Sequence, residues 1–526
     1  MRVSRAISEA LYAWGAREMF GNPGTTELPF LEDLPQRYLL TLQDGIALGA
    51  ADGLAQVDRR PSVVNLHSAP GLGNAMGYLD SAFRNRSPVV VTVGQQDQRQ
   101  FDQNPLLYGP FADWVGGRAK WAVEVSRVSD VESMLRKAWN VAATPPWGPV
   151  LVSLPMNLVE ETWPLPAIAP PEPSAVPGPS QVRPALEEVR QALDHATHPA
   201  IVSGYEVDAF DAFDPLVELS RKLGAPVFAE PLASRAPVPA GLGSFAGDLL
   251  PASVIINQML TPYDTVLLAG ADLILYPYFP AQVLAGKTVL YVGSDASIAT
   301  KLASRSVLGE PKALLGHLAS SVKDRGRAYR HPRDFSRANK IARARATMGG
   351  EFVLEIVRKV FPEHTIVDES VSNTPNLKAT GFYHGKDSYF ASRSGQLGWS
   401  LAASLGIGLR REKTLVVIGD GALMYAPQAL WTLRRYGIPV KVVVLNNHGY
   451  AILRSYSKAY HPPLTDSESM KIPDLDVVGL ATALGLKARS TSGAGELEGA
   501  LEELRDAKGP ALLNVEIDAR VPDLFS

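Results

Sequence analysis

Two short motifs place groups that bind metal ions and phosphates at the ends of predicted strands. GDG occupies residues 419–421 in VVIGDGALMYAPQ, and NN occupies 446–447 in VVVLNNHGYAILR, with 24 residues between them. Open α/β sheets bind ligands where their parallel strands end. The glycines beside Asp420 let the backbone approach a phosphate, and the oxygens of Asp420 and Asn447 suit Mg2+. Together the motifs predict a metal and diphosphate site, whereas either one alone reads more simply as a turn.

A buried acid near the N-terminus also calls for a chemical explanation. In LQDGIALGAADGLAQ (42–56), Asp44 ends a predicted short buried strand, and a helical run rich in Gly and Ala follows. Burying an unpaired carboxylate costs several kcal/mol. Asp44 therefore needs a partner or a role.

These groups need a scaffold, and three series of strand-like runs supply it. The runs are PSVVNLH, PVVVTVGQ and GPVLVSLP, then PAIVSG and DTVLLAGAD, and finally KTLVVIGDG and PVKVVVLNN. Runs that are apolar on both faces and alternate with helical runs indicate parallel sheets covered on each side. We therefore predict an α/β protein with three doubly wound parallel-sheet domains in series.

Two breaks in composition separate the three series. The first, WPLPAIAPPEPSAVPGPSQVRP (163–184), is rich in proline, which favours extended and semi-rigid chain. The second, SSVKDRGRAYRHPRDFSRANK (320–340), is polar and basic. We predict domains at 1–165, 185–325 and 345–526, with linkers at 166–184 and 326–344.

The overall composition excludes several classes of protein. The 526 residues are 46% apolar and 20% charged, with a net charge of −3, so we expect neither a nucleic acid nor a membrane partner. The chain has no cysteine, which excludes disulfides, thiolate metal sites and cysteine nucleophiles. We find no signal peptide and no apolar run that would span a bilayer, and we predict a cytoplasmic enzyme.

The motifs together resemble a known family. GDG followed at this interval by NN is the signature of thiamine diphosphate (ThDP) enzymes. The order FGNPGTTELPF, LQDGIALGAADGLAQ, NLHSAPGLGNAMGYLDSAFRNRSPVVVTVGQQ, a middle domain and GDG to NN is most similar to the benzoylformate decarboxylases, which belong with the acetolactate synthases. The resemblance covers nearly the whole chain and is weakest in the middle domain. It implies pyrimidine-binding, central and diphosphate-binding domains.

The resemblance implies a cofactor site in the third domain. Mg2+, with Ca2+ as a possible substitute, would be bound by Asp420, Asn447 and the backbone carbonyl of Gly449. Leu397 matches the bulky residue that bends ThDP, and simple core packing is its alternative. The Gly395 carbonyl matches the acceptor for the 4′-amino group, although ASRSGQLG is one residue longer than the family pattern. The implied cofactor-binding residues are Val371, Ser372, Gly395, Leu397, Gly421, Ala422 and Tyr450.

Three residues of the first domain match catalytic positions. Thr25 of NPGTT matches a serine that contacts substrate, and His67 of NLHSAPG matches a catalytic histidine just beyond a strand. Without the resemblance, Thr25 would be a turn residue and His67 a structural histidine. Asp44 stands where the family has a glutamate that hydrogen-bonds the pyrimidine N1′ of ThDP.

The shorter acid at position 44 is a departure from the family. Losing one methylene withdraws the carboxylate by up to about 1.5 Å. A misplacement of about 1 Å can cost on the order of a hundredfold in rate. A shifted backbone, a bridging water or slow proton movement in the cofactor would each account for the change, and we expect one of the first two.

A second departure concerns the proton donor and the substrate pocket. Benzoylformate decarboxylases have a second catalytic histidine in the segment that reads LLAGADLILYPYFPAQVL here, where the alignment gives Pro277. A tyrosine, His67 or water would have to protonate the intermediate instead. Ile452 matches the isoleucine of pyruvate decarboxylases, and apolar walls favour an uncharged substrate side chain. The expected pocket residues, for which core packing is the alternative, are Leu106, Leu107, Tyr276, Ile452 and Tyr456.

The resemblance implies non-oxidative decarboxylation of a 2-keto acid, dependent on ThDP and Mg2+, to an aldehyde and CO2. The substrate would be benzoylformate-like, branched or aliphatic. The alternatives are a ThDP-dependent carboligase or C–C lyase acting on acyloins, and a ThDP-binding protein with little catalysis. We expect a homo-oligomer, a tetramer, with active sites at the subunit interface. FAD, which binds the corresponding middle domain in acetolactate synthases, is not expected.

Overall fold

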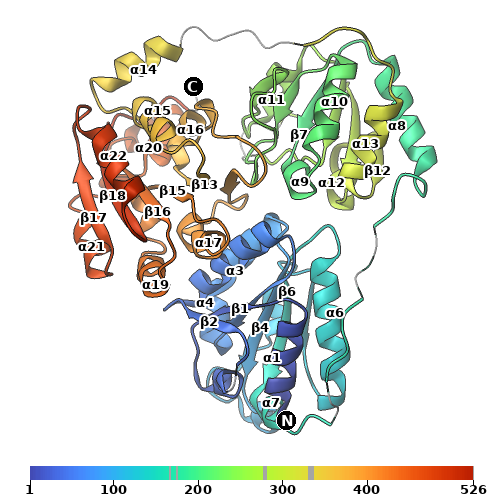
Figure 1. The fold of residues 1–526 in the computed structure, drawn as a ribbon, viewed down its shortest axis with the longest axis vertical. Helices are drawn as coiled ribbons and strands as arrows, with labels where there is room; N and C mark the ends of the chain where they lie inside the picture. Colours follow the sequence, from blue (N-terminus) through green and yellow to red (C-terminus); the bar gives the residue numbers. More distant parts are fainter. Residues whose placement is uncertain are drawn as a thin grey trace. The chain divides into compact units, whose positions relative to one another are not determined.

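The chain folds into two compact units, each described by itself. The computed structural model describes residues 1–32, 34–164, 167–172, 174, 176–275, 281–329 and 337–524. One unit contains Met1–Ser174, Lys340–Leu377 and Ser394–Ser526, and the other contains Ala175–Asn339 and Lys378–Arg393. Figure 1 colours the first sheet blue to cyan, the middle sheet green to yellow and the last sheet orange to red.

The first sheet has the strand order β2-β1-β3-β4-β6-β5, and all its pairings are parallel. Its strands are β1 (Glu18–Gly21), β2 (Arg37–Leu40), β3 (Ser62–Leu66), β4 (Val89–Gln95), β5 (Trp121–Glu124) and β6 (Val150–Pro155). Its helices are α1 (Val3–Ala13), α2 (Leu28–Leu31), α3 (Asp44–Asp58), α4 (Ser68–Arg84), α5 (Phe111–Trp114), α6 (Val131–Ala143) and α7 (Met156–Glu160). Short 3-10 turns are η1 (Thr25–Glu27), η2 (Gln98–Gln103) and η3 (Val128–Asp130).

The middle sheet has the order β12-β11-β10-β7-β8-β9 with parallel pairings, which is the order of dinucleotide-binding folds. Its strands are β7 (Pro199–Ser203), β8 (Val227–Ala229), β9 (Phe245–Asp248), β10 (Thr265–Ala269), β11 (Thr288–Gly293) and β12 (Arg305–Leu308). Its helices are α8 (Arg183–His195), α9 (Tyr205–Ala209), α10 (Phe213–Leu223), α11 (Ser253–Leu260), α12 (Ala296–Leu302) and α13 (Pro311–Ser321).

The last sheet has the order β14-β13-β15-β16-β18-β17, the same pattern as the first sheet. Its strands are β13 (Thr365–Glu369), β14 (Tyr389–Ala391), β15 (Thr414–Gly419), β16 (Lys441–Asn446), β17 (Lys487–Thr491) and β18 (Ala511–Glu516). Its helices are α14 (Arg337–Arg345), α15 (Gly350–Val360), α16 (Thr374–Ala379), α17 (Trp399–Gly408), α18 (Asp420–Leu423), α19 (Gln428–Tyr436), α20 (Ala451–Tyr460), α21 (Val477–Ala483) and α22 (Leu497–Asp506). The 3-10 turns are η4 (Val371–Asn373), η5 (Pro462–Leu464) and η6 (Glu468–Met470).

These three sheets confirm the predicted fold class. Helix α14 falls largely within the predicted linker 326–344, and the predicted domain boundaries remain predictions. Within the described part of the chain, no helix combines the length and the apolar character needed to cross a membrane.

The Gly- and Ala-rich run after Asp44 owes its composition to close helix packing. Helices α3 and α17 lie side by side in the first unit (Figure 1). A Cβ atom on Gly53 would lie 2.2 Å from the Ala403 carbonyl oxygen, so only glycine allows this approach. The buried Asp52 carboxylate accepts a hydrogen bond from the Trp399 indole N–H at 2.7 Å. Helix α3 therefore joins the first and last sheets into one unit.

Candidate active site

A pocket opens at the carboxyl edge of the last sheet, where β13, β15 and β16 end. Its walls combine the turn after β13, the GDG motif and the segment after NN. The lining residues are Ser370, Val371, Ser372, Asn373, Leu397, Gly419, Asp420, Gly421, Ala422, Leu445, Asn447, Gly449, Tyr450, Ala451 and Ile452. The pocket thus brings together all but one of the predicted metal and cofactor residues, the exception being Gly395.

The two predicted metal-binding side chains converge in this pocket. The Gly449 N–H donates to Asp420 Oδ2 at 3.1 Å and to Asn447 Oδ1 at 3.2 Å. Asp420 is buried, and burial raises the pKa of its carboxyl to about 6. A divalent cation would relieve that cost, and oxygen atoms are the ligands that Mg2+ prefers. The donor set therefore fits the expected ion.

The backbone beside Asp420 is shaped for close approach of a ligand. A Cβ on Gly421 would lie 2.7 Å from the Tyr450 ring, whereas a Cβ on Gly419 would meet nothing within 4 Å. The Gly419 side is open, and its backbone is accessible to a phosphate group. This arrangement fits the diphosphate that the sequence predicts here.

Two residues of the candidate site have a strained backbone. Val371 has a φ of 49°, and His448, between Asn447 and Gly449, has a φ of 56°. A β-branched residue in the left-handed region is a genuine outlier, and such strain clusters at ligand-binding sites. In the first sheet, Ser68, next to His67, has a φ of 45°. The sequence alone does not predict these backbone conformations.

A buried acid holds the loop that carries Leu397. Glu369, at the end of β13, accepts hydrogen bonds from the backbone N–H groups of Gly398 and Ser400. Burial raises the pKa of Glu369 to about 8. Leu397 lines the pocket, while Gly395, with a φ of 77°, lies two residues earlier and is not part of the lining. The loop enters the site through Leu397.

Asp44 and His67 lie together at the carboxyl edge of the first sheet. Strand β2 ends at Leu40, so the prediction that Asp44 ends a strand is wrong: Asp44 is the first residue of α3. Its Oδ1 accepts from the backbone N–H of His67 at 3.0 Å, and burial raises the pKa of its carboxyl. His67 directly follows β3, as predicted, and forms the N-cap of α4. Asp44 therefore has a partner within its own chain, the backbone of His67.

The sequence reading missed two residues that contact His67. Thr25 opens η1 with an exposed side chain, whereas the next residue, Thr26, is buried, and its hydroxyl lies 3.4 Å from His67 Nδ1. Glu27 is fully buried, with Oε2 2.8 Å from His67 Nδ1. The available signal was an acid enclosed between TT and the apolar LPF.

The predicted substrate-pocket residues fall into two groups. Leu106 is 83% exposed, and the Leu107 carbonyl accepts from the Ala69 N–H, close to His67 in the chain. Ile452 lines the pocket of the last sheet, and Tyr456, one turn later on α20, packs against Tyr460. Tyr276 lies outside the described residues, as do Pro277 and Tyr278.

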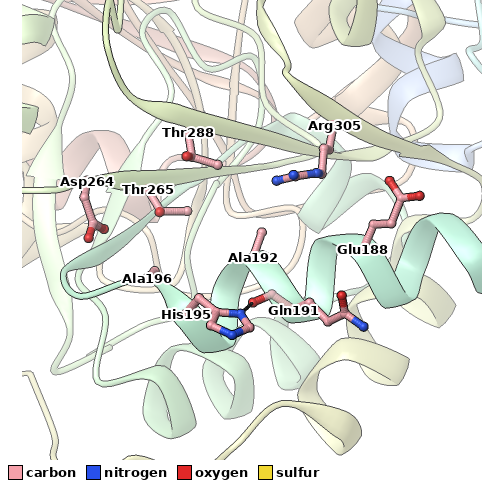
Figure 2. Close-up of a pocket in the computed structure, with 9 residues that line it drawn as sticks. All are labelled: Glu188, Gln191, Ala192, His195, Ala196, Asp264, Thr265, Thr288 and Arg305. Carbon is pink, nitrogen blue, oxygen red and sulfur yellow. Dashed lines mark hydrogen bonds between the residues drawn. The ribbon is translucent and has the colours of Figure 1, made fainter.

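The middle sheet has a larger cavity of about 690 Å3, shown in Figure 2. It lies between α8 and the starting residues of β10, β11 and β12. Its lining residues are Glu188, Gln191, Ala192, His195, Ala196, Asp264, Thr265, Thr288 and Arg305. Ligands of open α/β sheets bind at the opposite, carboxyl edge, so we assign this cavity no role.

The carboxyl edge of the middle sheet is filled by acids of the chain itself. Glu206 and Glu230 are fully buried, and burial raises the pKa of each carboxyl to about 7. Glu206 accepts from the Ser294 N–H and hydroxyl, and Glu230 accepts from the Tyr205 N–H. Arg393 lies 3.6 Å from Glu230. These groups take up the position where dinucleotide-binding folds hold a pyrophosphate.

Comparison with protein families identifies three matching domains. They are the N-terminal TPP binding domain of thiamine pyrophosphate enzymes at residues 1–108, the central domain at 186–318 and the C-terminal TPP binding domain at 376–515. Thiamine pyrophosphate is the same compound as ThDP. The predicted family and its three domain types are confirmed.

Individual relatives agree with this result. Benzoylformate decarboxylase of Pseudomonas aeruginosa is 34% identical over 98% of each chain. A protein of Oryza sativa subsp. japonica described as probable acetolactate synthase 2, chloroplastic, is 26% identical over 97% of this chain and 82% of its own. The solved structure of the ThDP-dependent 4-hydroxybenzoylformate decarboxylase of Rhodococcus jostii RHA1 is 30% identical, covers 99% of this chain and 100% of its own, and has a TM-score of 0.90.

Proposed function

Because the chain belongs to the thiamine pyrophosphate enzyme family and resembles its benzoylformate decarboxylases, we propose that it decarboxylates a 2-keto acid to an aldehyde and CO2, using ThDP and Mg2+. The convergence of Asp420 and Asn447 beside an open glycine backbone carries this proposal. That arrangement suits a metal ion shared with phosphate oxygens.

The residues of the last sheet would bind the cofactor. Asp420, Asn447 and the Gly449 carbonyl would hold Mg2+, and the amides near Gly421 and Ala422 would hold the diphosphate with Val371 and Ser372. Tyr450 closes the side of Gly421, and Leu397 would press on the cofactor from the opposite loop. When bound, ThDP supplies the carbon nucleophile and accepts the electrons that CO2 leaves behind.

The residues of the first sheet would act on protons. His67 has a partly exposed side chain and a pKa raised by its hydrogen bond to Glu27, so it holds a proton more readily than an ordinary histidine. Asp44 would face the pyrimidine of the cofactor, and Thr25, whose side chain is exposed, would contact the substrate. The carboxylate of Asp44 also keeps the His67 backbone in place.

We further propose that the complete site forms between copies of the chain. All lining residues of the pocket in the last sheet come from 370–452. Asp44, Thr25 and His67 would therefore be contributed by a second copy, in a homo-oligomer that we expect to be a tetramer. The cytoplasmic location and the lack of FAD remain predictions, and the acids that fill the carboxyl edge of the middle sheet support the latter.

A panel of keto acids tests the reaction. Benzoylformate, branched 2-keto acids and pyruvate are incubated with the enzyme, ThDP and Mg2+, and CO2 and aldehyde are measured. Release of both from at least one substrate is expected, with benzoylformate or an aliphatic keto acid preferred because Ile452 and Leu106 are apolar. Binding of ThDP without turnover of any keto acid or acyloin would instead favour a protein with little catalysis.

A carboligase or C–C lyase is the second candidate, supported by the acetolactate synthase relative. Adding an acceptor aldehyde to the same reactions distinguishes it. An acyloin that forms faster than free aldehyde would identify carboligation as the main reaction. Cleavage of an added acyloin would identify a lyase.

A further inference from the structure

We propose that Glu27 is a positioning residue for His67: it accepts the Nδ1–H of the imidazole and leaves Nε2 free to exchange protons with the substrate. The inference rests on the proposed function, in which His67 acts on protons. Nothing in the family matches or in the sequence motifs assigns a role to Glu27.

The contact between the two side chains is short and protected. Glu27 Oε2 lies 2.8 Å from His67 Nδ1, and the Glu27 side chain has no exposed surface. A carboxylate in such a place must be satisfied by donors, because an unpaired buried charge is costly. An Nδ1–H directed at Oε2 meets this need, whereas an unprotonated Nδ1 would face the carboxylate as a second acceptor.

The remaining donors around Glu27 fix its orientation. The Gly24 N–H donates to Oε2 at 2.9 Å, and the Thr26 hydroxyl donates to Oε1 at 2.6 Å. The Thr26 hydroxyl also lies 3.1 Å from the Ser68 hydroxyl, at the start of α4. The carboxylate is thus held by the turn η1 before it meets the ring.

Two glycines make room for this pair. A Cβ on Gly24 would lie 2.1 Å from the His67 ring, and a Cβ on Gly94 would lie 1.9 Å from Glu27 Oε1. Glycine at both positions lets the imidazole stack on one backbone and the carboxylate on another. Gly24, just before η1, and Gly94, on β4, therefore leave the space that the His67–Glu27 pair occupies.

A carboxylate at Nδ1 has a defined chemical effect. It selects the tautomer of the neutral ring, orients it and stabilises the imidazolium form. Among the described residues, two titratable groups act on the pKa of His67: Glu27 on η1 and Asp44 on α3. Tyr38 on β2 interacts with both acids, and its own pKa is raised by burial first and then by them. Asp44 binds the His67 backbone rather than the ring, so the tautomer depends on Glu27.

The first test uses the unmodified protein and no substrate. The apoenzyme is labelled with 15N- and 13C-histidine, and the His67 signals are assigned with His67→Gln among the nine histidines of the chain. NMR titration should show the Nδ1–H tautomer when His67 is neutral. An Nε2–H tautomer would overturn the proposal, whether or not the protein decarboxylates keto acids.

The second test changes the acid. Glu27→Gln keeps an acceptor but removes the charge, and the His67 pKa should fall by about one unit or more. With the preferred keto acid, kcat should fall about 100-fold with KM within about threefold. The basic arm of the pH profile, where a proton donor loses its proton, should move with the NMR value. Glu124→Gln is the matched control, since Glu124 ends β5 in the same sheet and accepts from Gln95 and Ser153.

The outcomes separate the two proposals. An unchanged His67 pKa in Glu27→Gln, or equal losses in the Glu27 and Glu124 variants, would reject the positioning role. If no keto acid is turned over, the proposed function fails, while the tautomer and the NMR pKa still decide whether Glu27 positions His67. If Glu27→Gln does not fold, the tautomer in the unmodified protein decides alone.

Discussion

The first and last sheets share one strand order, and their carboxyl edges place different chemistry at equivalent points. His67 follows β3 and Asp420 follows β15, which occupy the same position in the two sheets. Glu27 follows β1, as Val371 follows the equivalent β13. The same topology therefore places the His67–Glu27 pair at one edge and the pocket proposed to bind metal and phosphate at the other.

The two edges differ in which groups hydrogen-bond their acids. Glu27 and Asp44 accept from several groups of the chain, among them both the ring and the backbone of His67. At the other edge, the Asp420 carboxyl accepts from the backbone N–H groups of Gly421, Gly449 and Asp420 itself, and Asn447 shares the Gly449 N–H. The Gly419 side is open. The first edge is organised by its own side chains, whereas the last edge has an open side that would suit the proposed ion and phosphate.

Removing Asp420, at the carboxyl edge of the last sheet, should have the largest effect on activity. Asp420→Ala deletes the one carboxylate among the expected Mg2+ ligands, so kcat/KM should fall by about 1,000-fold or more, since metal stabilisation is worth several kcal/mol. Isothermal titration calorimetry should show the loss of Mg2+-dependent ThDP binding. Asp466→Ala is the control, with a carboxylate that is 85% exposed. Unchanged ThDP affinity in Asp420→Ala would show that the carboxyl edge of the last sheet does not bind the cofactor through Asp420.

Lengthening Asp44, at the carboxyl edge of the first sheet, tests whether the space around its carboxylate is already filled. Asp44→Glu adds a methylene where Oδ1 already lies 2.6 Å from a Cβ built on Gly71, so kcat/KM should fall about 10- to 100-fold through misplacement. Asp58→Glu, at the other end of α3, controls for a longer acid on the same helix. A large rise in activity would show instead that the short side chain limits cofactor activation.

Adding a methyl group at Gly419, on the open side of the pocket, tests the phosphate site without removing a charge. Gly419→Ala adds a Cβ that meets nothing within 4 Å in the protein, so the melting temperature without ligand should not change. The Kd for ThDP with Mg2+ should rise about tenfold, because a misfit at the bound phosphate costs about 1.4 kcal/mol. Gly499→Ala on α22, also with open space around it, is the control. Equal affinity in both variants would remove Gly419 from the phosphate site.

The smallest expected effect concerns the carboxyl edge of the middle sheet and the pH dependence of stability. The carboxyl pKa values of Glu206 and Glu230, raised to about 7, lie above their unfolded values. The stability they contribute is therefore complete below about pH 4.5 and is lost as pH rises through about 7. Between pH 5 and 8, the melting temperature of Glu206→Gln should fall less steeply than that of the unmodified protein, by a few degrees. Parallel curves would show that Glu206 is ionised throughout.

Much of the fold and half of the site could be predicted from local sequence. GDG and NN each end a strand, and both remain recognisable because a phosphate-binding turn needs glycine and a metal needs oxygen ligands. His67 could be placed because it directly follows the apolar run of β3. Thr26 could not, because nothing local distinguishes Thr25, which faces out, from Thr26, which faces His67. Glu27 had a local signal, an acid between TT and the apolar LPF, but that signal does not identify His67 as its partner.

The position of Asp44 shows that the pattern of apolar residues does not predict where a strand ends. The run before it resembles a strand, yet β2 ends at Leu40 and Leu42 adopts a φ of 61° before α3 begins. That turn brings Asp44 to the His67 backbone, 23 residues away in the chain. A left-handed leucine is not a local preference, so only the surrounding packing selects it.

The sequence by itself determined the three α/β domains and the ThDP family, and it predicted the metal and phosphate residues, because each depends on short-range patterns of apolar runs, glycines and oxygen ligands. Only the tertiary structure decided that α3 and α17 join the first and last sheets, and that Glu27 and Asp44 hold His67 by its ring and its backbone. The physical reason is that neighbouring strands of a parallel sheet bring together residues from distant turns. Which side chains pair at that edge depends on burial and geometry, which no local pattern records.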